Sequence, residues 1–364
     1  MTSNAHPPAE AAAEQHGHAP LSRAALFTVA GAVLVALALG SFALTQPADS
    51  YLLFTGFLLF LFMTQSLAWN LIGGYGGQTS FGHATFYGIG AYTTALLQEN
   101  AGWPPLPAVL AGAVGASIFS VIWGYPLFRL RGFYFAIATI GIGEATRLIA
   151  LNPLRDLTGG ASGFRLSTEA GSGRVEQFLT ALGLALVTFL LLYWIRNSKL
   201  GLGLFALNMD SDAAETLGVD TTRLKAIALA LSAFIVGLTG GVYVRAFLYI
   251  NPNDVFAFSI SIAMVLMAVI GGVGTLVGPI LGAVVYVVIQ DQLGAAQLTF
   301  RGQTFQFRDV QLGLYGLLLA LIILFEPAGL VGLFNRIGGL FRRRPPGQAL
   351  AEQQALLRDE TGGE

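Results

Sequence analysis

Long runs of apolar residues recur along almost the whole chain. A helix needs about 20 apolar residues to cross about 30 Å of hydrocarbon. Runs that predict such helices cover residues 24–44, 52–72, 79–98, 106–127, 133–151, 177–196, 226–248, 258–270, 273–290 and 309–325. The strands of a membrane β-barrel would alternate apolar and polar residues, and these continuous runs do not. The pattern therefore predicts an all-α, polytopic membrane bundle of about eight to ten transmembrane helices.

The segment 258–290 is the least regular part of this pattern. It is too long for one ordinary span, and "GGVG" at 271–274 interrupts it, so we expect two short helices there. In the stretch that follows, Gly274, Gly278 and Gly282 are each four residues apart. Residues at that spacing share one face of a helix, and small residues let two membrane helices approach closely. We therefore predict that these three glycines form a helix–helix packing face.

Composition supports the membrane class and limits the chemistry. Hydrophobic residues make up 54% of the 364 residues and charged residues only 11%, whereas soluble domains average about 25% charged residues. The formal net charge of −1 leaves no basic excess for a nucleic-acid partner. The chain has no cysteine, which excludes disulfides and cysteine-based metal sites. We predict neither a bound metal nor a cofactor.

The basic residues in the connections predict the orientation, because Lys and Arg favour the cytoplasmic side. With the N-terminus placed in the cytoplasm, the cytoplasmic side receives Arg23, Arg129, Arg131, Arg196, Lys199, Arg223, Lys225, Arg336 and Arg342–Arg344, and the outer side receives Arg155, Arg165, Arg174, Arg301 and Arg308. Both termini are therefore predicted to be cytoplasmic. The predicted parts are a disordered tail (1–22), a transmembrane domain (23–335) with an outer loop (152–176) and an inner loop (197–225), and a basic and polar tail (336–364).

The inner loop contains a short helix signal. In "DSDAAETLGV", Asp210 or Ser211 can cap the start of a helix and Gly218 can end it. The residues alone favour equally a docking element and a plain interfacial connector.

A glycine-dense stretch, "GGYGGQTSFGHATFYGIGAY" at 73–92, raises the question of phosphate binding. A Walker loop ends in Gly-Lys-Ser/Thr, but this chain has only two lysines, Lys199 and Lys225, and neither follows a glycine. A dinucleotide fingerprint needs a preceding strand, and here an apolar membrane run precedes it. Both readings are rejected, and with them a nucleotide-hydrolysing site on this chain.

Polar residues around the same stretch are unusual at membrane depth, where they normally face a cavity or a partner group. A break at 73–77 would create helix ends, and such ends in secondary transporters attract charged groups of a substrate. The residues predicted to line a solute pathway are Asn70, Gln78, Thr79, Ser80, His83, Tyr87 and Glu144. Two alternatives stay open. His83 can be a packing histidine, and Glu144 can simply pair with Arg147 on one helix face.

Four motifs in order resemble a known family. They are "WNLIGGYGGQTSFGHATFYGIGAYTTALL", "FYFAIATIGIGEATRLIALN" followed by "LTGGASG", "GGVGTLVGPILGAVV" and "LFEPAGLVGLF". Together they resemble the inner-membrane permease subunits of ATP-binding-cassette (ABC) importers for branched-chain amino acids, LivM type. The resemblance covers most of the chain from about Phe54 to Phe334.

The resemblance implies a non-enzymatic subunit that passes leucine, isoleucine or valine across the inner membrane by alternating access. It implies a second, homologous permease of LivH type, two cytoplasmic ATPase subunits that hydrolyse the ATP, and an external binding protein. It also implies that the inner-loop helix docks on the ATPases through Ala213, Ala214, Glu215, Leu217 and Gly218.

The chain departs from the family just before that helix. Family members usually carry arginines where this chain has Leu202, Phe205 and Asn208. Three alternative functions remain. The cargo can be urea, a short amide, or another amino or aromatic acid. A stand-alone secondary transporter would need more intramembrane carboxylates than Glu144 and Asp291, and a membrane enzyme would need a reactive pair or metal cluster.

Overall fold

The computed structural model describes residues 23–47, 49–130, 132–167, 171–294, 297–300, 303–325 and 328–341. The two predicted tails, 1–22 and all but the first few residues of 336–364, lie outside the described residues.

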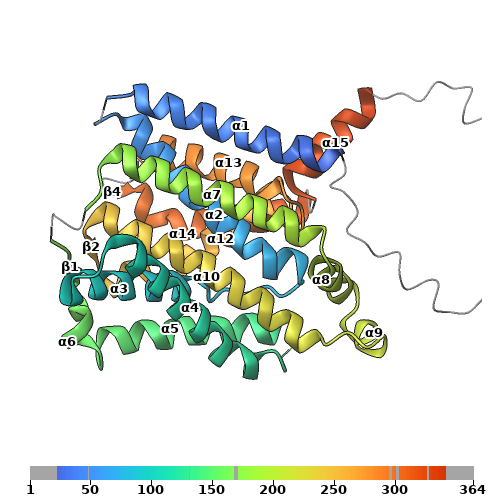
Figure 1. Cartoon of the computed structure of the whole chain (residues 1–364), viewed down its shortest axis with the longest axis horizontal. Coiled ribbons are helices and arrows are strands. Elements are labelled where there is room, and N and C mark those ends of the chain that lie inside the picture. Colours follow the sequence, from blue (N-terminus) through green and yellow to red (C-terminus); the bar gives the residue numbers. More distant parts are fainter. Residues whose placement is uncertain are drawn as a thin grey trace, which may run out of the picture.

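The described chain is a bundle of long helices, with short elements gathered at its two ends (Figure 1). The long helices are α1 (Arg23–Thr45), α2 (Tyr51–Asn70), α3 (His83–Ala101), α4 (Pro105–Leu127), α5 (Phe133–Leu151), α7 (Arg174–Arg196), α10 (Thr221–Phe247), α12 (Phe258–Gly271), α13 (Gly278–Gly294) and α14 (Phe307–Phe325). Each of the runs that the sequence predicts to cross the membrane overlaps one of these helices. The all-α membrane fold is confirmed.

Short elements mark two opposite ends of the bundle. One end, called here the β1 end, carries α6 (Arg155–Thr158), the 3-10 turn η3 (Gly160–Ser162), the paired strands β1 (Phe164–Arg165) and β2 (Tyr249–Ile250), α11 (Pro252–Val255), and the hairpin of β3 (Gln297–Phe300) and β4 (Gln303–Gln306). The other, the α9 end, carries α8 (Lys199–Met209), α9 (Ser211–Thr216) and α15 (Gly329–Phe341).

Length and composition single out seven of the described helical segments as able to cross a membrane. The seven include a continuous segment Pro252–Gly271, in which α11 leads into α12. Three of the ten long helices, α3, α13 and α14, fall outside that set although they lie within the same bundle. The predicted count of eight to ten therefore depends on counting these helices as part of the membrane domain.

Small residues allow α3, α4 and α10 to pack closely at the centre of the bundle. A Cβ on Gly90 of α3 would overlap the carbonyl oxygen of Gly237 on α10, and a Cβ on Gly240 would overlap the carbonyl oxygen of Tyr87. A Cβ on Gly112 of α4 would likewise lie only 2.6 Å from the carbonyl oxygen of Gly90. Several glycines of the stretch 73–92 therefore serve close helix packing.

Helix α2 ends in a π-helical turn, η2 (Leu71–Tyr75), and residues 76–82 are not helical. The predicted span 79–98 was therefore wrong for its first four residues. Backbone groups in this break are paired: the Gln78 N–H donates to the Ile72 carbonyl at 3.0 Å, and the Ser80 carbonyl accepts from the Trp69 indole at 2.7 Å. The Phe81 N–H donates to the Thr139 hydroxyl of α5 at 3.0 Å. These bonds remove the cost of non-helical backbone within the bundle.

The segment 258–290 forms two helices, α12 and α13, as its interruption predicts. A Cβ on Gly282 would overlap the Met267 carbonyl oxygen, and one on Gly278 would overlap the Gly272 carbonyl oxygen. Gly274 is different. It lies in the connecting loop with a φ of +76°, so the prediction that all three glycines share one helical face was wrong. The reason is that α13 begins only at Gly278, after a turn that needs left-handed backbone at Gly274.

Candidate functional site

Asn70 is held on both sides of its amide by the loop between α12 and α13. Its Nδ2 donates to the Thr275 carbonyl at 2.8 Å, and its Oδ1 accepts from the Gly274 N–H at 2.9 Å. The side chain is fully buried. Both halves of the amide are therefore used to join the end of α2 to this loop, and Gly274 contributes a backbone donor to that junction.

His83 is also tied to neighbouring helices. Its Nε2 lies 3.0 Å from the Ser232 hydroxyl of α10, and that hydroxyl donates to the Ala68 carbonyl of α2 at 2.6 Å. The Ser232 oxygen therefore accepts from the imidazole N–H. The histidine is fully buried, and its Nδ1 has no hydrogen-bond partner within the described residues. These contacts favour the packing interpretation of His83.

The other polar residues of the break differ in exposure. Ser80 is buried and its hydroxyl accepts from the Gly82 N–H at 3.4 Å, Gln78 is half-buried, and Thr79 is exposed. Glu144 lies on the exposed side of α5, where its carboxylate accepts from Arg147 Nε at 3.0 Å. Arg147 also donates to Asn253 of α11. The ion pair with Arg147 gives the Glu144 carboxylate a partner within α5, so its presence there does not require a solute.

Tyr87 lines a cavity that the sequence analysis did not predict. The cavity has a volume of about 400 Å³ and lies between α2, α3, α10, α11, α12 and α13. The polar residues of its wall are Gln65, Tyr87, Tyr243, Asp254, Ser259, Tyr286 and Gln290. We call this space the tyrosine cavity. Apart from Tyr87, none of these residues was among the predicted pathway residues, because the others come from five separate elements and share no sequence pattern.

The tyrosine cavity extends from the β1 end of the bundle into its interior. Asp254 lies in α11 at the β1 end, and Tyr243 is four residues before the end of α10. Gln65 lies fourteen residues after Tyr51, which places it about 21 Å along α2 at about 1.5 Å per residue. Gln65 therefore lies more than half the thickness of an apolar bilayer core away from the start of α2.

The wall of the tyrosine cavity combines aromatic surface with free polar groups. The rings of Tyr87 and Tyr243 lie 5.6 Å apart, and those of Phe62 and Tyr286 lie 5.3 Å apart. The Gln65 Nε2 donates to the Thr239 hydroxyl at 3.3 Å. Among the described residues, the Gln65 Oε1, the Tyr87 hydroxyl and the Asp254 carboxylate have no hydrogen-bond or ion-pair partner. Such a cavity can bind a small molecule that is both polar and apolar.

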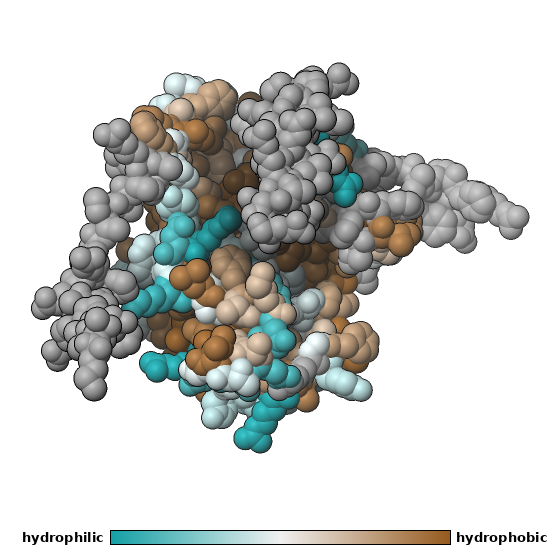
Figure 2. Space-filling model, turned by 90° about the vertical axis from the view of Figure 1, so that its right-hand side faces the viewer, coloured by the Kyte–Doolittle hydropathy of each residue, from teal (hydrophilic) through white to brown (hydrophobic). Residues whose placement is uncertain are grey.

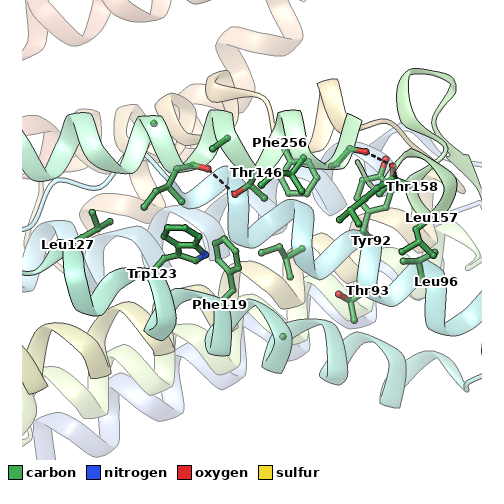
Figure 3. Close-up of a pocket in the computed structure, with 18 of the residues that line it drawn as sticks. Tyr92, Thr93, Leu96, Phe119, Trp123, Leu127, Thr146, Leu157, Thr158 and Phe256 are labelled. Atoms are coloured by element: carbon green, nitrogen blue, oxygen red, sulfur yellow. Dashed lines mark hydrogen bonds between the residues drawn. The ribbon is translucent and has the colours of Figure 1, made fainter. Parts of the chain in front are cut away.

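A second cavity, of about 740 Å³, lies between α3, α4 and α5 and is almost entirely apolar. Figure 3 shows Phe119 and Trp123 on one side of it and Thr146 on the other. The Thr146 hydroxyl donates to the Ile142 carbonyl of its own helix at 2.8 Å, and the Thr158 hydroxyl of α6 donates to the Ala150 carbonyl of α5 at 2.6 Å. None of the described residues that line this cavity is charged. Its larger volume therefore does not make it the better site for a charged solute.

The α9 end presents the helix predicted in the inner loop. The Asp210 carboxylate caps α9 by accepting from the Asp212 and Ala213 N–H groups at 2.9 and 3.0 Å. Gly218, with a φ of +85°, follows the helix and reverses the chain. Ala214 is buried, while Ala213, Glu215 and Leu217 are exposed. Figure 2 looks onto this end and shows hydrophilic residues beside exposed apolar ones.

The family described as "Branched-chain amino acid transport system / permease component" matches residues 51–325. The chain belongs to this family. The matched range begins at the start of α2 and ends at the end of α14, so it includes both cavities and α9. It leaves out α1 and α15.

Several curated relatives have similar sequences. The permease protein LivM of a high-affinity branched-chain amino acid transport system is 30% identical in Salmonella typhimurium, over 74% of this chain and 68% of the relative. LivM of Escherichia coli is 28% identical, over 75% of this chain and 68% of the relative. LivH of Escherichia coli is 25% identical, over 73% of this chain and 90% of the relative. No solved structure matches the chain. The likeness to LivM over most of the chain identifies a LivM-type permease of the multi-pass inner-membrane class.

Proposed function

We propose that this permease forms, with a second permease of LivH type, the membrane part of an ABC importer for branched-chain amino acids. The observation that carries the proposal is the family match over residues 51–325, together with relatives named for that transport. Two cytoplasmic ATPases supply the energy by hydrolysing ATP, and an external binding protein delivers the cargo. Both termini lie in the cytoplasm, as does the α9 end.

The α9 helix is the proposed contact for the ATPases. It is short, capped by Asp210 and stands at one end of the bundle, with the Met209 and Leu217 side chains 91% and 85% exposed on either side of it. Large exposed apolar side chains next to a polar surface are typical of a protein contact. The contact residues would be Ala213, Ala214, Glu215, Leu217 and Gly218, of which Ala214 mainly packs α9 onto the permease.

The residues before α9 connect this contact to the membrane interior. Where family members usually carry arginines, Asn208 donates to the Gly74 carbonyl at 3.0 Å and the Phe205 ring lies 5.0 Å from Tyr75. Leu202 is exposed. Movement of α9 by the ATPases would therefore pull on the π-helical turn after α2. Asn70 at the start of that turn passes the movement to the α12–α13 loop.

The transport cycle needs only a shift between two conformations. ATP-driven closure of the partner subunits favours one conformation, and a docked, loaded binding protein favours the other. The hydrogen bonds from Asn208 to Gly74, and from Asn70 to the α12–α13 loop, are the contacts of this chain that would link the α9 end to the interior of the bundle.

Reconstitution tests the proposal. The permease is purified with the two ATPases, the second permease and the binding protein, and placed in proteoliposomes with ATP. Uptake of labelled leucine that requires ATP and all subunits is the expected result. Uptake of urea, a short amide or an aromatic acid in place of leucine would contradict the proposed cargo, and uptake without the ATPases would contradict the class.

A further inference from the structure

The mouth of the tyrosine cavity brings together two groups of opposite polarity. Asp254 contributes a carboxylate that is exposed and has no hydrogen-bond or ion-pair partner among the described residues. The N-terminal end of α12 begins at Phe258, and both Ala257 and Ser259 line the cavity. The first N–H groups of a helix carry partial positive charge. A negative and a positive group thus lie within one turn of each other along the chain.

An α-amino acid in water carries its ammonium and its carboxylate on one carbon. Asp254 lies four residues before the start of α12, so one such molecule can meet both groups, its ammonium pairing with the carboxylate and its carboxylate meeting the first N–H groups of the helix. A solute lacking either charge would leave one of these groups without a partner. Charge complementarity therefore favours a zwitterion at the mouth.

The deeper wall fits the rest of such a molecule. Phe62, Tyr87 and Tyr286 supply aromatic surface for an apolar side chain. The Tyr87 side chain is only 4% exposed and its hydroxyl has no hydrogen-bond partner among the described residues, as is true of the Gln65 Oε1. Both residues line the cavity, so these polar groups are available to a ligand there.

We propose that the tyrosine cavity is a binding site for a zwitterionic, apolar amino acid, in which Asp254 binds the ammonium group and the start of α12 binds the carboxylate. The cargo side chain lies against the tyrosines, deeper in the bundle. The inference rests on the proposed function for the identity of the solute. It goes beyond that function by placing recognition on this chain rather than on the binding protein alone.

The absence of native cysteine allows a direct test. In the assembled importer, Ala263→Cys places one thiol in the wall of the tyrosine cavity, and Ala138→Cys places one in the wall of the apolar cavity. Both are reacted with 2-aminoethyl methanethiosulfonate, with and without excess free leucine and without the binding protein. Leucine should slow modification of Ala263→Cys about tenfold or more and leave Ala138→Cys unchanged.

Asp254→Asn in the Ala263→Cys background should abolish this protection, because the neutral amide cannot pair with the ammonium. Asp254→Glu should retain it, and Asp156→Asn, an exposed carboxylate elsewhere at the β1 end, should leave it unchanged. The leucine analogue in which a hydroxyl replaces the amino group should not protect. Equal protection in Asp254→Asn, or protection by the hydroxy acid, would overturn the proposal.

Leucine uptake by the unmodified importer separates this proposal from the preceding one. An importer that takes up leucine but shows no protection of Ala263→Cys contradicts the cavity site alone. An importer that takes up no leucine contradicts the proposed cargo instead.

Discussion

The side-chain amide of Asn208 donates a hydrogen bond to the carbonyl oxygen of Gly74 at 3.0 Å. Asn208 belongs to α8, next to the proposed ATPase contact, and Gly74 belongs to the π-helical turn that ends α2. A turn of this kind leaves carbonyl groups that the helix itself cannot satisfy. One side chain of α8 therefore holds the irregular end of a membrane helix.

Asn208→Ala is expected to weaken the coupling between ATP hydrolysis and transport, because it frees the turn from α8. The number of leucine molecules imported per ATP should fall severalfold, while ATPase activity persists. Asn197→Ala is the matched control, since the Asn197 amide donates to Tyr193 within its own helix. An unchanged leucine-to-ATP ratio in Asn208→Ala would contradict this role.

Asn70→Ala should destabilise the permease more than a typical polar substitution. It leaves the Gly274 N–H and the Thr275 carbonyl without partners, at a cost of roughly 2–5 kcal/mol for the two groups. Thermal unfolding of the detergent-solubilised complex measures the effect as a lowered Tm. Asn152→Ala removes an exposed amide that bonds only to its own helix, and should change Tm little. Equal Tm values for the two variants would show that the hydrogen bonds of Asn70 do not stabilise the permease.

Gly282→Ala tests the packing of α13 on α12. A Cβ at this position overlaps the Met267 carbonyl oxygen, so the helices must separate, which costs about 1–3 kcal/mol. Gly183→Ala in α7 is the control, because a Cβ there meets no atom within 4 Å. We expect reduced yield and Tm for Gly282→Ala and a neutral or slightly stabilising effect for Gly183→Ala. An unchanged Tm for the Gly282→Ala complex would show that α13 can separate from α12 without loss of stability.

His83 and Gln78 distinguish packing from a direct role in the pathway. His83→Ala leaves Ser232 without its donor and should lower the yield of assembled complex, while leucine uptake per assembled complex changes less than twofold. His83→Gln offers an amide donor in its place and should restore part of the yield. Gln78→Ala should affect neither quantity. A strong loss of uptake per complex at normal yield would assign the residue to the solute pathway.

The α9 contact can be tested by cross-linking. Glu215→Cys, on the exposed part of α9, should cross-link to a cysteine placed on an ATPase subunit. Asp156→Cys, at the β1 end, should not, and should instead react with impermeant thiol reagents added outside the cell. Labelling of Glu215→Cys from outside would reverse the proposed orientation.

The sequence by itself determined the class of fold, because an apolar run long enough to cross a bilayer is a local property of the chain. It also revealed the interruption between α12 and α13 and the capped start of α9, since caps and turns depend on a few adjacent residues. The four ordered motifs also indicate the family, because each is a local feature of the sequence.

Tertiary structure decided which polar residues are free and which are already paired. The sequence predicted Asn70 and His83 as pathway residues, but in the structure Asn70 bonds to the α12–α13 loop and His83 bonds to Ser232. The tyrosine cavity could not be foreseen, because Gln65 and Asp254 belong to elements far apart in the chain. Whether a buried polar group meets a partner or a cavity depends on how the helices pack, and packing depends on contacts between residues distant in sequence.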